Sequence, residues 1–226
     1  MELLVFGHAG APVLAFPTRQ GRFYDYENWG LAAALAGSIN GGLIQLFCVD
    51  SLDSETFYCR CSDHHKRITR HNQYEQYLLS EVIPFIRDSN PNPFLIAHGC
   101  SIGAYHAANI ALRHPGLFGK IVALSGRYDL TRSFGFFPDL FDGYYSEDIY
   151  FHMPTHFVPN LTENRLLGQL RKLEVIFAVG ERDFFRDSNI HLSAALSSKG
   201  VANTLAIWDG TSHNPAAWRQ MLPHYL

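Results

Sequence analysis

The feature that most limits the possible folds is a short run near the middle of the chain, Gly99-Cys100-Ser101-Ile102-Gly103. Apolar residues at 94–97 precede the run and predict a β-strand, and a helical pattern follows over 102–114. Side chains at the flanks of so sharp a turn would collide, and glycine at both flanks removes the collisions. The sequence therefore predicts a strand–turn–helix unit that presents Ser101. A turn of small residues where a helix packs closely on a sheet would have the same pattern.

The rest of the chain alternates short apolar runs with helical patterns. Strands are expected at 2–6, 12–16, 42–49, 94–98, 120–125, 173–179 and 204–208. Helices are expected at 27–36, 73–87, 102–114, 190–199 and 215–225, and residues 51–70 are expected to be irregular. This alternation implies an α/β fold with a mostly parallel central sheet and helices on both faces. No repeat or linker interrupts the pattern, so a single domain is expected over residues 1–226.

The composition excludes several classes of partner. The 226 residues are 47% hydrophobic and 17% charged, which is enough apolar material for a buried core. A formal net charge of -3 argues against a nucleic-acid footprint and against a basic membrane-binding patch. The twelve histidines are scattered without the spacing of a zinc site, so no metal is expected.

The cysteines and the N-terminus bear on the expected location. Cys59 and Cys61 are separated by one residue, which is not a usual disulfide or zinc pattern, so free thiols in a reducing compartment are expected. The N-terminal residues lack the basic region of a signal peptide, and no apolar run has the 18 or more residues of a membrane span. We therefore expect a soluble cytoplasmic protein.

Residues 129–161 break the alternation of strands and helices. The segment is rich in Phe and Tyr, contains Pro138, Pro154 and Pro159, and has little periodicity. It follows an expected strand end, where open α/β sheets bind their ligands. A long segment of this kind is often a functional lid or pocket wall. The alternative is an aromatic insertion that simply packs on the domain.

A serine presented on such a turn can act as a nucleophile only if another group takes its proton. In chain order, an acid and then a histidine should each follow a later strand. The strand at 173–179 leads to Asp183, and the strand at 204–208 leads to His213. Asp183 would orient His213, which would take the proton of Ser101 and return it to the leaving group.

Other acidic residues and histidines compete for these positions. Glu181 and Asp187 lie near Asp183, and Asp209 lies near His213. Asp183 is preferred because it stands at the usual distance past its strand, although it could instead cap the helix expected at 190–199. Of the other histidines, we expect His98 in the core below the turn, His106 and His114 on the helix surface, and His224 exposed at the terminus.

The expected site also needs backbone N–H groups that stabilise an oxyanion. The N–H of Ile102, at the start of the helix, is one candidate donor. The second should come from the loop after the strand at 12–16, where the N–H groups of Arg19 and Gln20 remain alternatives. The side chain of Arg19 could hold an anionic substrate group, or it could be a solvated loop arginine.

Several segments together resemble the α/β-hydrolase superfamily and, within it, the putative esterase family with its esterase D-like members. The segments are GCSIGAYHAANIALRHP at 99–115, YEQYLLSEVIPFI at 74–86, VGERD at 179–183, and the Ser212-His213 pair followed by a helix with Trp218. The resemblance implies that Ser101, Asp183 and His213 are nucleophile, acid and base. It further implies hydrolysis of a carboxylic ester or thioester through an acyl-enzyme, without a cofactor. The chain departs from the family pattern at FPTRQGRF, 16–23, where many esterases carry an early acidic or His-Gly signature.

Two other functions are compatible with the same residues. One is acyl transfer to an alcohol, which shares the acyl-enzyme. The other is a non-catalytic α/β-hydrolase relative that binds a small ligand. The expected partner is a small-molecule ester, with an apolar or aromatic acyl or alcohol group suggested by the aromatic segment 129–161. No nucleic acid or membrane partner is expected, and a homo-oligomer is possible.

Overall fold

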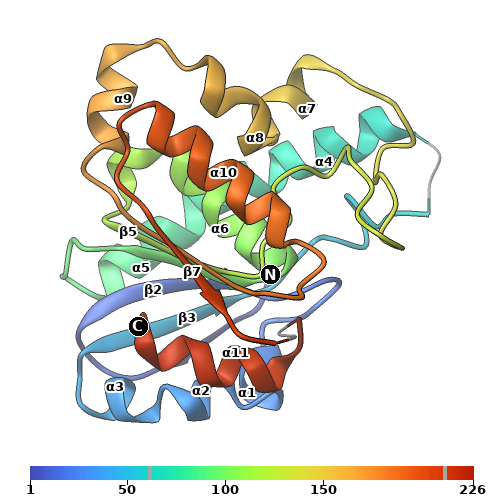
Figure 1. The fold of residues 1–226 in the computed structure, drawn as a ribbon. Coiled ribbons are helices and arrows are strands. Elements are labelled where there is room, and N and C mark those ends of the chain that lie inside the picture. Colours follow the sequence, from blue (N-terminus) through green and yellow to red (C-terminus); the bar gives the residue numbers. More distant parts are fainter. Residues whose placement is uncertain (61–62, 211–212) are drawn as a thin grey trace.

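The central sheet is mostly parallel, as the alternation of strands and helices predicts (Figure 1). The computed structural model describes residues 1–60, 63–210 and 213–226. Within these ranges seven strands form one sheet in the order β1-β3-β2-β4-β5-β6-β7. The strands are β1 (Leu3–Phe6), β2 (Ala11–Phe16), β3 (Ile44–Val49), β4 (Ile96–Cys100), β5 (Lys120–Leu124), β6 (Glu174–Gly180) and β7 (Thr204–Trp208). Only β1 pairs antiparallel among them, and each expected strand is confirmed to within a few residues.

Helices cover both faces of the sheet, as expected (Figure 1). On one face lie α1 (Asp25–Asn28), α2 (Leu31–Ala34), α3 (Ala36–Asn40) and α11 (Pro215–Met221). On the other face lie α4 (His64–Tyr77), α5 (Ile83–Ser89), α6 (Ile102–Arg113) and α10 (Arg186–Ser198), together with α7 (Glu147–His152), α8 (Pro154–Phe157) and α9 (Asn164–Leu170). A π-helical turn, Leu78–Val82, joins α4 to α5. None of the described helices is both long and apolar enough to cross a bilayer.

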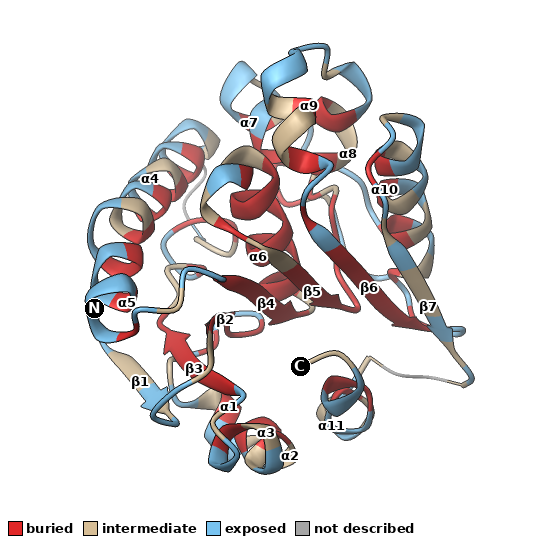
Figure 2. Cartoon of the chain, turned by 90° about the vertical axis from the view of Figure 1, so that its left-hand side faces the viewer, coloured by how far each residue is buried: buried red, intermediate tan, exposed pale blue. Residues whose placement is uncertain are grey.

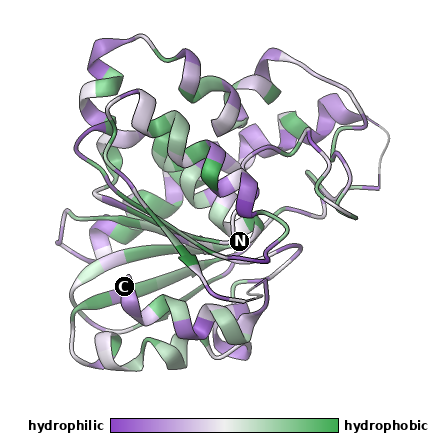
Figure 3. Ribbon diagram, in the orientation of Figure 1, coloured by the Kyte–Doolittle hydropathy of each residue, from purple (hydrophilic) through white to green (hydrophobic). Residues whose placement is uncertain are grey.

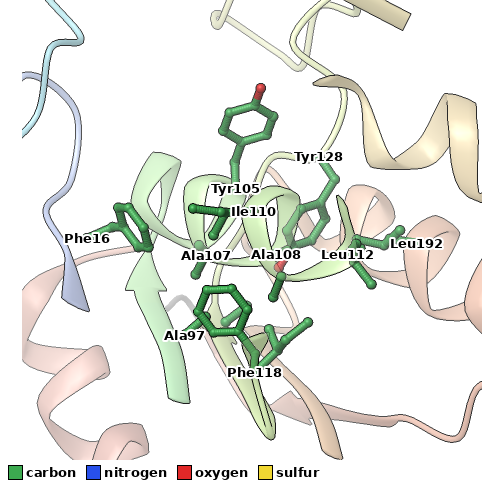
Figure 4. Packing of buried hydrophobic residues seen from close by; sticks show 14 of the residues in the cluster. Phe16, Ala97, Tyr105, Ala107, Ala108, Ile110, Leu112, Phe118, Tyr128 and Leu192 are labelled. Atoms are coloured by element: carbon green, nitrogen blue, oxygen red, sulfur yellow. The ribbon is translucent and has the colours of Figure 1, made fainter. Parts of the chain in front are cut away.

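The core consists of two apolar clusters, one on each side of the sheet. Side chains alternate along β2, so Leu14 and Phe16 face one cluster while Val13 and Ala15 face the other. The inner strands are buried along their length and the edge strands are only partly buried (Figure 2). Hydrophobic residues concentrate on the strands and on the inward faces of the helices (Figure 3). Helix α6 is almost fully enclosed between the sheet and the outer helices (Figure 4).

Three expectations about secondary structure and cysteines are wrong. Residues 64–70 form the first half of α4 rather than an irregular segment, because the carboxylate of Asp63 caps the helix by accepting the N–H of Lys66 over 3.0 Å. The helix expected at 27–36 is broken at Gly30, whose φ of 69° is left-handed. Cys59 is in a disulfide rather than free, whereas Cys48 and Cys100 are free and buried. The expectations for Cys61 and Ser212 concern positions outside the described residues.

The turn between β4 and α6 is built on direct backbone contact. Ser101 has φ 59° and ψ -121°, a strained conformation for a residue with a side chain. A Cβ atom on Gly99 would overlap the carbonyl group of Gly103. A Cβ atom on Gly103 would in turn overlap the carbonyl oxygen atoms of Phe16 and Pro17. Glycine at both positions therefore lets β4, α6 and the end of β2 meet closely enough to hold Ser101 at the edge of the sheet.

Gly99→Ala is expected to lower the free energy of unfolding by about 1–3 kcal/mol or more, because the new methyl group overlaps backbone atoms that cannot rotate away. The matched control is Gly168→Ala. Gly168 lies within α9, and a Cβ atom there meets nothing within 4 Å, so alanine should stabilise the protein by about 0.8–1 kcal/mol. Chemical denaturation measures both changes. Equal stability of Gly99→Ala and the wild type would show that the two backbones are not in contact.

Candidate active site

Ser101 lies at the carboxyl end of β4, directly before the first residue of α6. Its N–H donates to the carbonyl oxygen of Leu124 over 2.8 Å, which fixes the turn to the neighbouring strand β5. Its Oγ lies 3.1 Å from Nε2 of His213, a residue 112 positions later in the chain. The side chain is partly exposed and lines a cavity of about 330 Å³. The serine is therefore presented to a cavity and is not sealed in the core.

His213 lies between β7 and α11 and contacts the carboxylate of Asp183. Its Nδ1 lies 3.2 Å from Oδ1 and 3.1 Å from Oδ2 of Asp183. An ionised carboxylate only accepts hydrogen bonds, so Nδ1 carries the proton and Nε2 is left to accept the O–H of Ser101. The Asp183 side chain is 0% exposed and also accepts the N–H of Phe185 over 2.8 Å.

The competing carboxylates do not take this position. Glu181, Asp187 and Asp209 are all exposed, and none of them forms a hydrogen bond or ion pair with His213 in the described part of the chain. The sequence could not separate Asp183 from these neighbours by residue type. The separation comes from the turn after β6, which directs the Asp183 side chain inward and leaves Glu181 at the surface.

Aromatic rings enclose the imidazole of His213. Phe185 lies 5.0 Å away and Trp218 lies 5.4 Å away, both with their rings edge-on to the imidazole. Phe137, from the segment 129–161, lies 6.2 Å away. All three rings also line the cavity. They limit the access of water to the imidazole, whose side chain is 16% exposed.

Arg19 and Gln20, the two alternatives for the second backbone N–H that would stabilise an oxyanion, differ in their surroundings. The N–H of Gln20 donates to Oδ2 of Asp53 over 3.2 Å, and Gln20 does not line the cavity. The N–H of Gln20 is thus engaged with a carboxylate, which favours Arg19 over Gln20 as the second donor. Arg19 and Ile102 both line the cavity. Ile102 is the first residue of α6, so its N–H has no acceptor within the helix.

Asp53 and His106 form a buried pair that the sequence analysis missed. Nε2 of His106 donates to Oδ1 of Asp53 over 3.0 Å, and the two side chains are 3% and 1% exposed. The expectation of a surface His106 is wrong because α6 is covered on all sides by the sheet and by the other helices. Asp53 thereby links α6 to the loop that carries Arg19 and Gln20.

The remaining histidines lie close to where they were expected. His98 is in the core, where its Nδ1–H donates to the carbonyl oxygen of Val122 over 2.7 Å. Burial lowers the pKa of His98 to about 4, so its ring stays neutral. His224 is exposed. His114 is only partly exposed, because its Nε2 contacts Glu75 at 3.1 Å.

The cavity has the size of a small-molecule site and a mixed lining. Its walls are formed by Thr18, Arg19, Trp29, Tyr58, Ser101, Ile102, Arg127, Phe137, Phe185, His213 and Trp218. Arg127 was missed in the sequence, although it directly follows Ser125-Gly126 at the end of β5. Asp183 was predicted because it is a polar residue just past the end of a strand, and the same rule would have predicted Arg127. In the described ranges no cluster of three or more His, Cys, Asp or Glu side chains could hold a metal ion.

The strand order, the parallel sheet and the serine turn between β4 and α6 together define the α/β-hydrolase fold. Within this class, the family model described as putative esterase matches residues 26–224. The chain belongs to this family and is therefore an esterase by class. No curated protein matches the chain.

Solved structures of other esterases share the fold. A ferulic acid esterase has a TM-score of 0.71 at 16% identity, over 98% of this chain and 89% of that chain. An S-formylglutathione hydrolase from Agrobacterium tumefaciens has a TM-score of 0.70 at 12% identity, over 98% and 86%. FphF, a fluorophosphonate-binding serine hydrolase from Staphylococcus aureus, has a TM-score of 0.61 at 16% identity, over 96% and 82%. At these identities the likeness establishes the fold alone.

The geometry predicts which carboxylate supports the reaction. Asp183→Asn keeps the shape of the side chain but should favour the wrong tautomer of His213, and kcat for an activated ester should fall by about 10,000-fold. The matched control is Asp209→Asn, which changes an exposed acid near the same histidine and should leave kcat within about twofold. Steady-state kinetics with a 4-nitrophenyl ester measures both. A larger loss in Asp209→Asn than in Asp183→Asn would contradict the assignment.

Proposed function

We propose that this protein is a serine hydrolase that cleaves a carboxylic ester or thioester through an acyl-enzyme on Ser101. One observation carries the proposal: the hydrogen-bonded series from Ser101 Oγ through His213 to the buried carboxylate of Asp183, at the edge of a cavity. The three groups stand in the chemical order that nucleophilic catalysis by serine requires.

The reaction follows from the positions of the protons. His213 Nε2 takes the proton of Ser101 while Oγ attacks the carbonyl carbon of the ester. The bond to the leaving alcohol or thiol then breaks, and His213 returns the proton to that group. In the second half, water attacks the acyl carbon while His213 takes a proton from it. The bond between that carbon and Ser101 Oγ then breaks, His213 returns the proton to Oγ, and the acid is released. Asp183 holds the ring in place and stabilises its charged form.

Backbone N–H groups would stabilise the oxyanion of each tetrahedral intermediate. The donors that we propose are Ile102, at the N-terminus of α6, and Arg19, in the loop after β2. The positive end of the α6 dipole is oriented toward the same position. The buried pair of Asp53 and His106 would hold the Arg19 loop through the N–H of Gln20.

Similar folds support an ester or thioester substrate. The solved structures include a ferulic acid esterase and an S-formylglutathione hydrolase, whose names describe an oxygen ester and a thioester. Acyl transfer to an alcohol would use the same acyl-enzyme, and the distinguishing observation is which acceptor attacks it. A purely ligand-binding role would not need Ser101, His213 and Asp183 to be hydrogen bonded in series.

We also propose that the start of the segment 129–161 acts as a wall of the substrate cavity. Phe137 lines the cavity beside His213. It packs against Phe185 at 4.8 Å and against Phe136 at 4.4 Å. An aromatic wall favours an apolar or aromatic group on the acyl or alcohol side of the ester.

Removing the base tests the proposal. His213→Ala is expected to lower kcat by at least about 10,000-fold, because Nε2 of His213 is the one side-chain group that contacts Ser101 Oγ among the described residues. His224→Ala, which removes an exposed histidine, is the control and should keep wild-type kcat. With 4-nitrophenyl acetate the wild type should release a burst of nitrophenol equal to the enzyme concentration when deacylation limits the rate. A loss of less than about tenfold in His213→Ala would show that the base is a different residue.

A further inference from the structure

The cavity contains two arginines and no acidic residue among its described lining residues. Arg127 lies at the end of β5 and Arg19 lies in the loop after β2, on the two sides of β4. Two other carboxylates of the site already have partners, since Asp183 contacts His213 and Asp53 contacts His106. No carboxylate among the described lining residues therefore forms an ion pair with either arginine.

Arg127 is buried without a carboxylate partner. The residue is 3% exposed, and in the described part of the chain it forms no ion pair. Its Nη2 donates to the carbonyl oxygens of Arg132 at 2.8 Å and Pro138 at 2.5 Å, and its Nε donates to that of Asp129 at 3.3 Å. Its Nη1 has no acceptor among the described residues, although Arg127 lines the cavity. The charges of Asp129 and Asp139 offset part of the cost of burying Arg127 but form no ion pair with it. A buried cation without an ion pair is costly, so an anion in the cavity would be favoured.

The second arginine, Arg19, contacts Tyr58, which also lines the cavity. The guanidinium carbon of Arg19 lies 5.8 Å from the centre of the Tyr58 ring. Burial and the charge of Asp53 raise the pKa of Tyr58 to about 12, and the charges of Arg127 and Arg19 act against this rise. The Tyr58 O–H therefore stays protonated in the cavity that the two arginines also line.

Arg127 is also separated from the proposed base by a single ring. Its guanidinium carbon lies 6.0 Å from the centre of the Phe185 ring, and that ring lies 5.0 Å from the imidazole of His213. Guanidinium groups bind carboxylates in a planar, two-pronged geometry. We propose that Arg127 and Arg19 bind the carboxylate of an anionic ester while Ser101 attacks its ester carbonyl. The inference rests on the proposed serine hydrolase function and specifies its substrate class.

Two pairs of esters that differ in one charge test the inference. On the acyl side, mono-4-nitrophenyl adipate is compared with 4-nitrophenyl hexanoate, which has the same acyl chain length. On the alcohol side, 4-acetoxybenzoate is compared with its methyl ester. Each kcat/KM is divided by the uncatalysed hydrolysis rate of that ester. In one of the two pairs the wild type should prefer the anionic member by about 10–100-fold, as expected for a charge-assisted hydrogen bond.

Arginine variants show whether the preference comes from the two guanidinium groups. Arg127→Met and Arg19→Met should each bring the ratio of anionic to neutral kcat/KM toward one. The matched control is Arg132→Met, since Arg132 is an exposed arginine of the segment 129–161 that lies 5.3 Å from the Phe134 ring and outside the cavity. Its ratio should equal the wild-type ratio. If Arg127 only holds its loop, both members of a pair lose activity equally and the ratio persists, which overturns the inference.

Binding to Ser101→Ala separates this inference from the proposed function. The intact esters cannot acylate alanine, so their dissociation constants can be measured directly by calorimetry. Tighter binding of the anionic member by about tenfold or more, lost in Ser101→Ala/Arg19→Met, supports the inference even if the wild type hydrolyses none of the esters. Equal binding of both members in both pairs overturns it even if Ser101 proves to be the nucleophile. If Arg127→Met fails to fold, Arg127→Lys should lower the ratio only in part, because lysine keeps the charge and loses the two-pronged geometry. The exposed Arg19→Met should still bring the ratio toward one, and an unchanged ratio in both variants overturns the inference.

Discussion

The structure depends on the contact between the backbones of β4, α6 and β2 around Gly99 and Gly103. This contact is possible only without side chains at the two positions, and it forces Ser101 into a left-handed conformation at the edge of the sheet. The same contact brings the start of α6 beside the loop after β2, so that Ile102 and Arg19 line one cavity. A packing constraint thus determines where the proposed nucleophile and the proposed oxyanion donors meet.

The outer parts of the site are held by buried polar groups rather than by apolar packing. Asp53 joins α6 to the Gln20 loop, and the Asp183 carboxylate joins the turn after β6 to His213. Removing one partner of either contact would leave a buried polar group without a hydrogen bond, which costs free energy. These contacts therefore determine the positions of the side chains as well as contributing to stability. Arg127 differs from both, since its hydrogen bonds in the described part of the chain go only to carbonyl oxygens, although it lines the cavity.

Periodicity and turn chemistry were enough to predict the seven strands, the turn at Ser101, and the chain positions of Asp183 and His213. Parallel strands bring their carboxyl ends to one edge, so residues just past them must gather there. The sequence failed where polar residues face inward. Residues 64–71 of α4 are largely polar in sequence but bury Arg67 and His71, and His106 lies on a helix that is enclosed on all sides. A single sequence does not show which polar side chains will find buried partners.

The central claim is that Ser101 is the nucleophile and that His213 activates it. The most direct measurement is mass spectrometry of the protein after incubation with a fluorophosphonate, which reacts covalently with activated serine hydroxyl groups. The account predicts a single adduct, mapped to the peptide that contains Ser101, absent from Ser101→Ala and strongly slowed in His213→Ala. An adduct on another residue, or no adduct on protein shown to be folded by circular dichroism, would contradict it.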